Sequence, residues 1–205
     1  MGKKRKGAML CIEVICGCMF AEKSEELIRR IHVLSYAKKK IQVFKPMIDD
    51  RYAADAIVSH NGRRIPCYAV TDADALAALV EADSEVIAID EVQFFDHRIV
   101  DLCERLADEG RRVMVAGLDL DFRGEPFGVM GELLARSEFV TKLTAVCACC
   151  GAPATRTQRL VNGKPAACEE NVVLIGADEC YEARCRRHHE VLSIQEQKKG
   201  GDRQR

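Results

Sequence analysis

One segment near the start of the sequence combines residue types that bind phosphate. Lys23 and Ser24 follow Gly17 across a short loop, after an apolar run and directly before a stretch of helical period. This order is required by a phosphate-binding loop (P-loop), whose backbone N–H groups surround the phosphates while the Lys contacts their outer oxygens and the Ser hydroxyl binds Mg²⁺. The residues predicted to face the phosphates are Gly17, Cys18, Met19, Phe20, Ala21, Glu22, Lys23 and Ser24.

Glu22 departs from this pattern, because a P-loop has Gly immediately before the Lys. A Glu side chain adds bulk where phosphate must approach the backbone, and its charge repels phosphate by an energy on the order of 1 kcal/mol or more. We therefore expect weakened or reoriented phosphate binding. Taken alone, the segment is equally consistent with an unrelated turn in which Ser24 caps the helix.

A pair of carboxylates follows another apolar run. Asp90 and Glu91 come directly after Val86 to Ile89, which is the Walker B arrangement. Asp90 is predicted to hold Mg²⁺ through water, and Glu91 to remove a proton from an attacking hydroxyl. Such a pair is more often a solvated turn or a helix cap, but the P-loop upstream favours catalysis. The predicted ATP-binding segment also includes Val92 and Gln93.

The last third of the sequence has the spacing of a zinc site. Cys147 and Cys150 form a C-x-x-C pair, and Cys185 and His188 form a C-x-x-H pair. Four such ligands fill the tetrahedron that Zn²⁺ prefers and leave no position for a substrate water, so the predicted site is structural. The adjoining Cys149 and His189 are alternatives to Cys150 and His188.

The other cysteines are predicted to be passive. The chain has 11 Cys, an odd number, and without an export signal a disulfide framework is not expected, which favours metal binding for the paired ones. Isolated cysteines in apolar stretches behave as small buried hydrophobes. Those in apolar stretches are Cys11, Cys16, Cys18, Cys67 and Cys103, and those without a partner at the required spacing are Cys168 and Cys180.

Alternating strands and helices must position these groups. Short β-branched runs predict buried strands at Leu10 to Ile15, Ile41 to Phe44, Val86 to Ile89, Val113 to Ala116 and Leu143 to Val146. Helical periods lie at Glu25 to Lys39, Ala73 to Ala82, Arg98 to Glu109 and Val129 to Ser137. This alternation predicts an α/β fold with a mostly parallel sheet covered on both faces, and ligands beyond the carboxyl ends of its strands.

The composition changes after Val146, where Cys, Arg, Gly and Pro become frequent and helical periodicity ends. Short antiparallel strands are predicted at Thr155 to Val161 and Val172 to Ile175. We expect a nucleotide-binding core over residues 8–146 and a zinc-binding domain over 147–192, too small to be stable through an apolar core alone. Residues 1–7 and 193–205 are expected to be flexible tails.

Composition excludes several classes of function. Lys and Arg total 31 against 32 Asp and Glu, so the chain has no overall basic field and no nucleic-acid polymer is expected as a partner. No apolar run approaches the ~20 residues that a membrane helix needs, so no membrane association is expected. Without an apolar signal core behind the N-terminus, a cytoplasmic location is expected.

These segments together closely resemble the type II thymidine kinase family, which is found in most bacteria and in the animal cytosol. The resemblance covers about residues 11 to 191. It rests on IEVICGCMFAEKSEELIRR, FKPMIDDRY, VSHNG, IAIDEVQFF, VAGLDLDFRGEPFG, VTKLTAVC and the paired cysteines before GAPATRTQRL and within YEARCRRHH. It implies a RecA-like P-loop core with a small zinc-bearing lasso domain, usually assembled as a homotetramer.

The resemblance also implies a reaction, transfer of the ATP γ-phosphoryl group to the 5′-hydroxyl of thymidine or deoxyuridine with Mg²⁺. Glu91 matches the family's base, Asp90 the residue facing magnesium, and Arg51 an arginine near the phosphates. Family members are commonly inhibited by dTTP, so this chain is expected to share that property. The residues that match the thymine pocket are Phe122, Phe127, Val172, Val173, Leu174, Ile175, Gly176 and Tyr181, with Asp119 and Arg123 in the same loop.

Three hypotheses from different classes follow. The first, which we favour, is an active thymidine kinase, because Lys23, Ser24, Asp90 and Glu91 are all present. The second is a kinase-like nucleoside-binding protein with low or no activity because of Glu22. The third is a nucleic-acid-binding zinc ribbon, which is the weakest because few aromatic residues lie among the arginines of the last third.

Overall fold

A computed structural model describes residues 10–47, 56–58, 62–169, 171–172 and 179–192. The helices are α1 (Lys23–Tyr36), α2 (Ala73–Leu79), the 3₁₀ helix η2 (Val92–Phe94), α3 (Arg98–Asp108) and α4 (Met130–Arg136). The strands are β1 (Cys11–Cys16), β2 (Ile41–Pro46), β3 (Ala56–Val58), β4 (Arg64–Pro66), β5 (Tyr68–Val70), β6 (Val86–Ile89), β7 (Arg112–Gly117), β8 (Phe139–Lys142), β9 (Ala145–Val146), β10 (Pro153–Ala154), β11 (Arg156–Val161), β12 (Lys164–Pro165) and β13 (Glu179–Arg184).

The chain forms two compact units. The first, here called the sheet unit, comprises Met1–Cys16, Glu22–Asp119 and Phe127–Leu143. The second, here called the cysteine unit, comprises Gly17–Ala21, Leu120–Pro126 and Thr144–Arg205. Two short loop segments are therefore grouped with residues that lie far from them in the sequence.

The sheet unit is built on six strands in the order β5-β2-β6-β7-β1-β8. Each neighbouring pair in this sheet is parallel, as the alternation of strands and helices predicts. The predicted α/β class with a parallel sheet is therefore confirmed. β1 and β6 both end at the carboxyl edge of the sheet. The loop that starts at Gly17 and the pair Asp90 and Glu91 therefore both begin at this edge.

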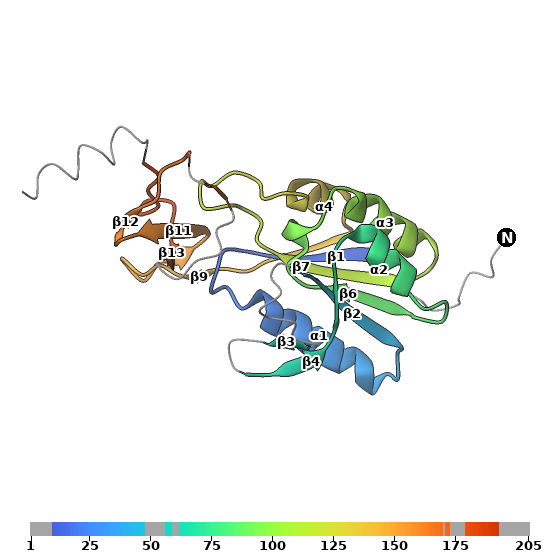
Figure 1. Cartoon of the computed structure of the whole chain (residues 1–205). Helices are drawn as coiled ribbons and strands as arrows, with labels where there is room; N and C mark the ends of the chain where they lie inside the picture. The colour runs from blue at the N-terminus through green and yellow to red at the C-terminus, as the bar shows by residue number, and fades with distance from the viewer. Residues whose placement is uncertain (1–9, 48–55, 59–61, 170, 173–178, 193–205) are drawn as a thin grey trace, which may run out of the picture. The chain divides into compact units, whose positions relative to one another are not determined.

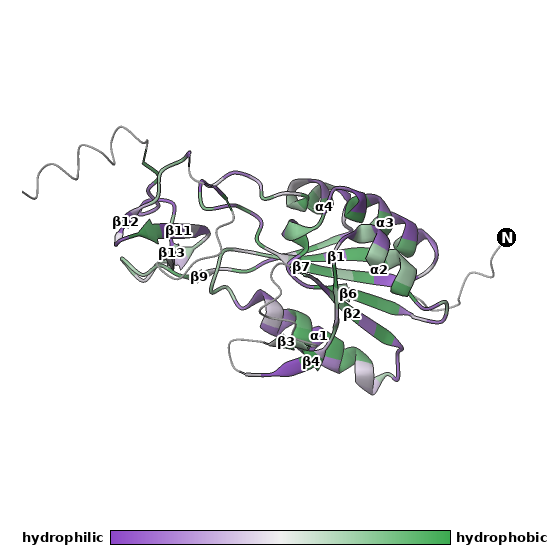
Figure 2. Cartoon of the chain, viewed as in Figure 1, coloured by the Kyte–Doolittle hydropathy of each residue, from purple (hydrophilic) through white to green (hydrophobic). Residues whose placement is uncertain are grey.

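Helices lie on both faces of this sheet (Figure 1), and most residues of its strands are hydrophobic (Figure 2). Ile12 and Val14 of β1 pack with residues of α2, α3 and α4 on one face. On the other face, Ile15 packs with residues of α1 and of the β3–β4 hairpin. All six residues of β1 are buried, because a parallel strand with helices on both sides has no face toward water.

One charged residue lies inside this apolar strand. Glu13 is 3% exposed and forms ion pairs with Arg112 of β7 and with Arg30 of α1, the latter at 3.1 Å. A buried carboxylate needs such partners, since an unpaired charge is strongly disfavoured in the protein interior. Arg30 also donates to Thr141 of β8. The two ion pairs and this hydrogen bond together connect three strands and a helix.

The strand predicted at Leu143 to Val146 is wrong in its position. The core strand at that place is β8 (Phe139–Lys142), while Ala145 and Val146 form β9 and pair antiparallel with β10. β8 is an edge strand with Phe139 and Val140 both about half exposed, so its sequence lacks the continuous apolar run of a buried strand.

The predicted helices occur with shifted ends. α1 spans Lys23–Tyr36 rather than Glu25 to Lys39, and α2 ends at Leu79 rather than Ala82. The alternative in which Ser24 caps the helix is wrong, because α1 begins at Lys23 and Ser24 lies inside its first turn.

The cysteine unit contains the small sheets β10-β9 and β12-β11-β13. β11 corresponds to the strand predicted at Thr155 to Val161, and it pairs antiparallel with β13 over its whole length. Of the strand predicted at Val172 to Ile175, only Val172 lies within the described residues, and it is not in a strand.

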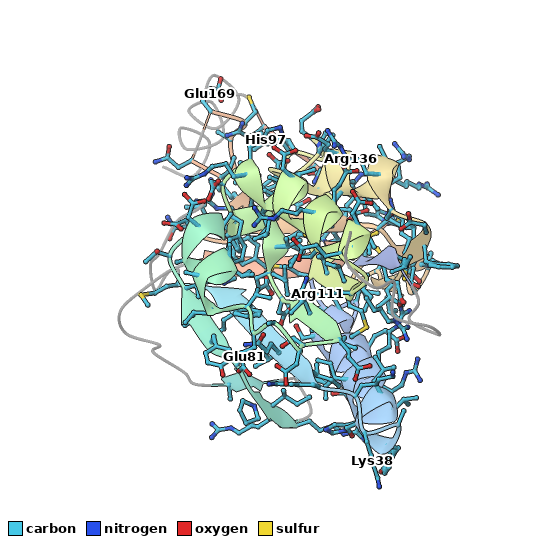
Figure 3. The ribbon with its side chains drawn as sticks, turned by 90° about the vertical axis from the view of Figure 1, so that its right-hand side faces the viewer. Lys38, Glu81, His97, Arg111, Arg136 and Glu169 are labelled. Atoms are coloured by element: carbon cyan, nitrogen blue, oxygen red, sulfur yellow. The ribbon has the colours of Figure 1, made fainter. Side chains whose placement is uncertain are left out.

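Charged side chains occupy the outside of the sheet unit. Lys38, Glu81 and Arg136, labelled in Figure 3, are exposed. Among the described residues, no helix has the length and apolar character needed to span a bilayer.

Candidate active site

The loop between β1 and α1 contains backbone conformations that favour glycine. Gly17, Phe20 and Glu22 have positive φ angles of 147°, 65° and 58°. For a non-glycine residue the left-handed conformation costs roughly 1–2 kcal/mol. Glu22 is exposed and precedes α1 without making a side-chain cap. The residue that departs from the P-loop pattern therefore also occupies a position at which Gly would be unstrained.

The first half of this loop bonds within the cysteine unit. The backbone N–H of Met19 donates to Oγ1 of Thr157 at 3.0 Å, and the Cys18 thiol donates to the carbonyl of Ala154 at 3.4 Å. Cys18 is buried, whereas Phe20 is 48% exposed. The residues predicted to surround the phosphates are thus anchored on β10 and β11 at this end of the loop.

The second half of the loop leads into α1 in the sheet unit. Lys23 is 8% exposed, and the Ser24 hydroxyl donates to Oδ2 of Asp90 at 2.8 Å. Asp90 follows β6 and is 5% exposed. Hydroxyl and carboxylate oxygens are ligands that Mg²⁺ prefers. Ser24 and Asp90 therefore fit the predicted magnesium site.

Burial raises the pKa of Asp90 to about 7, and the negative charge of Glu91 contributes in the same direction. The hydrogen bond from Ser24 and the charge of Lys23 oppose this shift. A buried carboxylate beside a second acidic group is a feature of functional sites, because it favours binding of a cation.

Glu91 and Gln93 form a hydrogen-bonded pair at the end of β6. Glu91 has a left-handed backbone (φ 50°), and its N–H donates to Oδ1 of Asp90 at 3.0 Å. Nε2 of Gln93 donates to Oε2 of Glu91 at 2.5 Å. The intervening Val92 is fully buried in the apolar core. The structure thus brings Ser24, Asp90 and Glu91 together at the carboxyl edge of one sheet.

The loop after β7 is a tight turn. Within the cysteine unit, Leu120 and Pro126 form an antiparallel bridge. Oδ1 of Asp121 accepts hydrogen bonds from the N–H groups of Arg123 and Glu125, at 2.8 Å and 3.1 Å. A carboxylate that satisfies two backbone donors fixes the turn.

Phe122, at the centre of this turn, lies between two cations. The guanidinium carbons of Arg123 and Arg159 are 5.3 Å and 5.1 Å from its ring centroid. The Phe122 carbonyl accepts a 2.8 Å hydrogen bond from Nε2 of His189. Arg159 is fully buried and donates to the carbonyl of Asn171 at 2.6 Å. These contacts fix the position of the Phe122 ring.

The other residues predicted for the thymine pocket lie in different places. Phe127 belongs to the sheet unit and packs edge to face on Phe94, with ring centroids 5.3 Å apart. Tyr181 is half-buried on β13, opposite Arg159 in the register. Val172 is half-buried. The predicted site residues outside the described residues are Arg51, Val173, Leu174, Ile175 and Gly176.

The predicted zinc ligands are assembled in the cysteine unit. The ligand atoms of Cys147, Cys150, Cys185 and His188 all lie within 4.8 Å of one another. Nδ1 of His188 is 3.3 Å from the Cys185 sulfur and 3.8 Å from the Cys147 sulfur. Neighbouring ligands of a tetrahedral zinc ion are about 3.5–3.8 Å apart, so this Cys₃His group can hold the ion.

The environment of Cys147 favours its thiolate form. Burial raises the pKa of this thiol, but hydrogen bonds from neighbouring backbone N–H groups, foremost that of Cys185, outweigh burial and bring the pKa to about 5. Metal binding requires the thiolate. The alternative ligands have other partners, since Cys149 contacts Arg184 and His189 bonds to Phe122.

A parallel sheet with Lys and Ser at the start of one helix, and an acidic pair after another strand of the same sheet, is typical of P-loop phosphotransferases. A model of the thymidine kinase family matches residues 10–189. The chain therefore belongs to the thymidine kinase family and is a kinase. Nucleotide and thymidine substrates are implied by this membership.

Several residues around the site were not identified from the sequence. Thr157 anchors the P-loop, and Arg159 lies against the Phe122 ring. Lys142 of β8 pairs at 2.7 Å with Asp119, which the sequence already places in the loop after β7. The run of β11 is polar in sequence, so no local pattern marks Thr157 and Arg159 as buried residues.

Proposed function

We propose that this kinase transfers the γ-phosphoryl group of ATP to the 5′-hydroxyl of thymidine or deoxyuridine, giving dTMP or dUMP in nucleotide salvage. The observation that carries the proposal is the hydrogen bond between Ser24 and Asp90, with Glu91 adjacent, in a chain of the thymidine kinase family. Phosphoryl transfer requires a cation site and a proton acceptor at one place.

The triphosphate is assigned to the P-loop, from Gly17 to Ser24. Lys23 contacts the outer phosphate oxygens, while the helix N-terminus adds partial positive charge. Mg²⁺, when held by Ser24 and Asp90, supplies positive charge to the phosphates. Arg51, Val92 and Gln93 are assigned to the ATP side of the site.

Glu91 is proposed as the general base. The 5′-oxygen forms a bond to the γ-phosphorus, the bond from that phosphorus to the bridging oxygen breaks, and ADP leaves with the bond's electron pair. Glu91 takes the proton of the 5′-hydroxyl. Its position immediately after Asp90, at the carboxyl edge of the sheet, supports this role.

The thymine ring of the substrate is assigned to a pocket formed by aromatic side chains and by Val172 to Gly176, here called the lasso segment. Phe122 and Phe127 are proposed beside the thymine ring, with Val172 to Gly176 closing over it largely through backbone hydrogen bonds, and with Tyr181 nearby. The fixed position of the Phe122 ring supports this assignment, because a stacking residue must be held in place.

The zinc ion is proposed to be structural, held by Cys147, Cys150, Cys185 and His188. With four protein ligands, no coordination position is open to a substrate. In this assignment residues 8–146 form the kinase core and 147–192 the zinc-binding lasso domain. A homotetramer and inhibition by dTTP remain predictions from the family resemblance, and a cytoplasmic location remains a prediction from the sequence.

A second candidate function is nucleoside binding with little or no turnover. The exposed, left-handed Glu22 favours it, since a charged side chain stands where the family pattern has Gly. A coupled assay of ADP release, with and without thymidine, distinguishes the two. Release that depends on thymidine supports the kinase, and ADP release unchanged by thymidine contradicts it. Glu91→Gln is the control for a contaminating kinase.

A further inference from the structure

Gln93 is a buried residue whose side-chain amide has a defined orientation. It is 3% exposed, and its Oε1 accepts a 3.1 Å hydrogen bond from the backbone N–H of Leu118. Because that N–H can only donate, the oxygen of the amide must face it. The amide NH₂ group is then left to donate to Glu91, at 2.5 Å.

Two glycines make room for this arrangement. A Cβ atom at Gly117, the last residue of β7, would clash with Oε1 of Gln93. A Cβ atom at Gly128 would lie 2.5 Å from the Gln93 carbonyl oxygen, and Gly128 also has a positive φ of 51°. The clash at Gly128 is with backbone and cannot be relieved by a side-chain rotation, whereas a side chain at Gly117 would displace the Gln93 amide from its present position.

Glu91 itself is in a conformation that needs support. Its left-handed backbone is disfavoured for a residue with a side chain. The N–H of Glu91 bonds to Oδ1 of Asp90, its carbonyl accepts from the N–H of Phe94 at 3.1 Å, and its carboxylate accepts from Gln93. Among the described contacts, the hydrogen bond from the Gln93 side chain is the one that holds the Glu91 carboxylate.

We propose that Gln93 is the positioning residue of Glu91. It transmits the fixed position of the Leu118 N–H at the end of β7 to the carboxylate that follows β6, and so holds the proton acceptor toward the substrate hydroxyl. This inference rests on the proposed role of Glu91 as the base. Positioning of a catalytic group matters because a displacement of about 1 Å can lower the rate by roughly 10²-fold.

Gln42 provides a matched control within the same unit. It is 4% exposed, and its amide bonds to the backbone carbonyl of Leu79 at 3.0 Å and the N–H of Glu81 at 2.9 Å. It has no contact with Glu91 among the described contacts. A buried Gln that serves only the fold is thus available for comparison.

The experiment compares Gln93→Met with Gln42→Met in the full-length zinc-bound protein. Met conserves the volume of Gln but removes the amide. Gln93→Met is expected to lower kcat roughly 10-fold to 10²-fold while KM for thymidine changes less than about twofold. Gln42→Met is expected to lower the melting temperature with kcat unchanged. An unchanged kcat in Gln93→Met overturns the proposal.

Epistasis with Glu91 separates positioning from a general structural effect. If Gln93 acts through Glu91, then Gln93→Met causes no further loss of kcat in a Glu91→Gln background. An equal loss in both backgrounds overturns the proposal. If Gln93→Met does not fold, Gln93→Leu replaces it, since Leu also removes the amide without adding a charge beside Glu91, and the same outcomes apply.

A structural measurement decides the proposal without reference to turnover. In the crystal structure of Gln93→Met, or of Gln93→Leu, the Glu91 carboxylate is expected to move by about 1 Å or more. An unmoved carboxylate overturns the positioning role. If instead the parent protein releases no ADP with thymidine while the carboxylate moves in the variant, the proposed function fails and the positioning role holds.

Discussion

The Ser24 hydroxyl donates a 2.8 Å hydrogen bond to Oδ2 of Asp90, a residue 66 positions later in the chain. Ser24 lies in the first turn of α1, and Asp90 directly follows β6. The bond therefore joins the two motifs that the sequence places far apart. Asp90 bonds to Ser24, whereas Glu91 bonds to Gln93. The two acidic residues are therefore expected to have separate roles, Mg²⁺ binding for Asp90 and proton acceptance for Glu91.

The two carboxylates are expected to fail differently on substitution. Glu91→Gln keeps size but removes the proton acceptor, so kcat should fall by roughly 10²–10⁴ while thymidine still binds. Asp90→Asn weakens the Mg²⁺ site, so raising Mg²⁺ should partly restore its activity. Steady-state kinetics over a range of Mg²⁺ concentrations check both. Near-parental kcat in Glu91→Gln would contradict the assignment of Glu91 as the base, and Asp119 and Asp121 would then be the candidates to test.

Glu22 is expected to weaken ATP binding. Glu22→Gly removes the charge and the left-handed strain together, and should lower KM for ATP by roughly fivefold, corresponding to about 1 kcal/mol. Glu22→Gln removes the charge but keeps a side chain at φ 58°, so it should recover only the electrostatic part. Steady-state kinetics against ATP measure the three proteins. Identical ATP kinetics would mean that the loop accommodates Glu22 without cost.

The zinc prediction is one ion per chain in a structural site. Cys185→Ser should lose the metal and expose the lasso domain to protease, because structural zinc contributes on the order of 10 kcal/mol in small metal-dependent folds. Cys149→Ser is the matched control, since Cys149 is exposed and lies outside the Cys₃His group. Metal analysis of protein purified without chelator tests the prediction. The ligand assignment would be refuted if the parent protein contained no zinc, or if Cys149→Ser lost its zinc.

The central sheet was predictable because its strands are apolar on both faces. β6 occurs at the predicted residues, Val86–Ile89, and β1 is shifted by one residue. The edge strand β8 was not predicted, because Phe139–Lys142 carries Thr and Lys and is half exposed. Periodicity reports burial, so it detects strands only where burial is continuous.

The contacts inside the site were not predictable from spacing. Gln93 lies one residue from a buried Val in the sequence, but its partner Leu118 belongs to another strand end. Arg159 occurs within the polar-looking run of β11, yet it is among the largest fully buried side chains. Such long-range pairs depend on the register between elements, which local sequence does not encode.

Arg159 is expected to set the affinity for thymidine through Phe122. Arg159→Met removes the guanidinium 5.1 Å from the Phe122 ring centroid and the hydrogen bond to the Asn171 carbonyl, just before the lasso segment. A cation–π contact contributes about 0.5–2 kcal/mol, so KM for thymidine should rise roughly 2-fold to 30-fold. The contacts removed are those to Phe122 and Asn171, whereas the P-loop bonds to Ala154 and Thr157. KM for ATP should therefore change less than KM for thymidine.

Arg123→Met is the comparison variant for this prediction, since Arg123 also faces the Phe122 ring, at 5.3 Å, but is less buried than Arg159. A partly solvated cation interacts more weakly with an aromatic ring, so this variant should raise KM for thymidine less. Initial rates over a thymidine series, at saturating ATP, measure both variants against the parent. An unchanged KM for thymidine in Arg159→Met, in protein that still binds zinc and keeps its melting temperature, would show that Phe122 is positioned without Arg159.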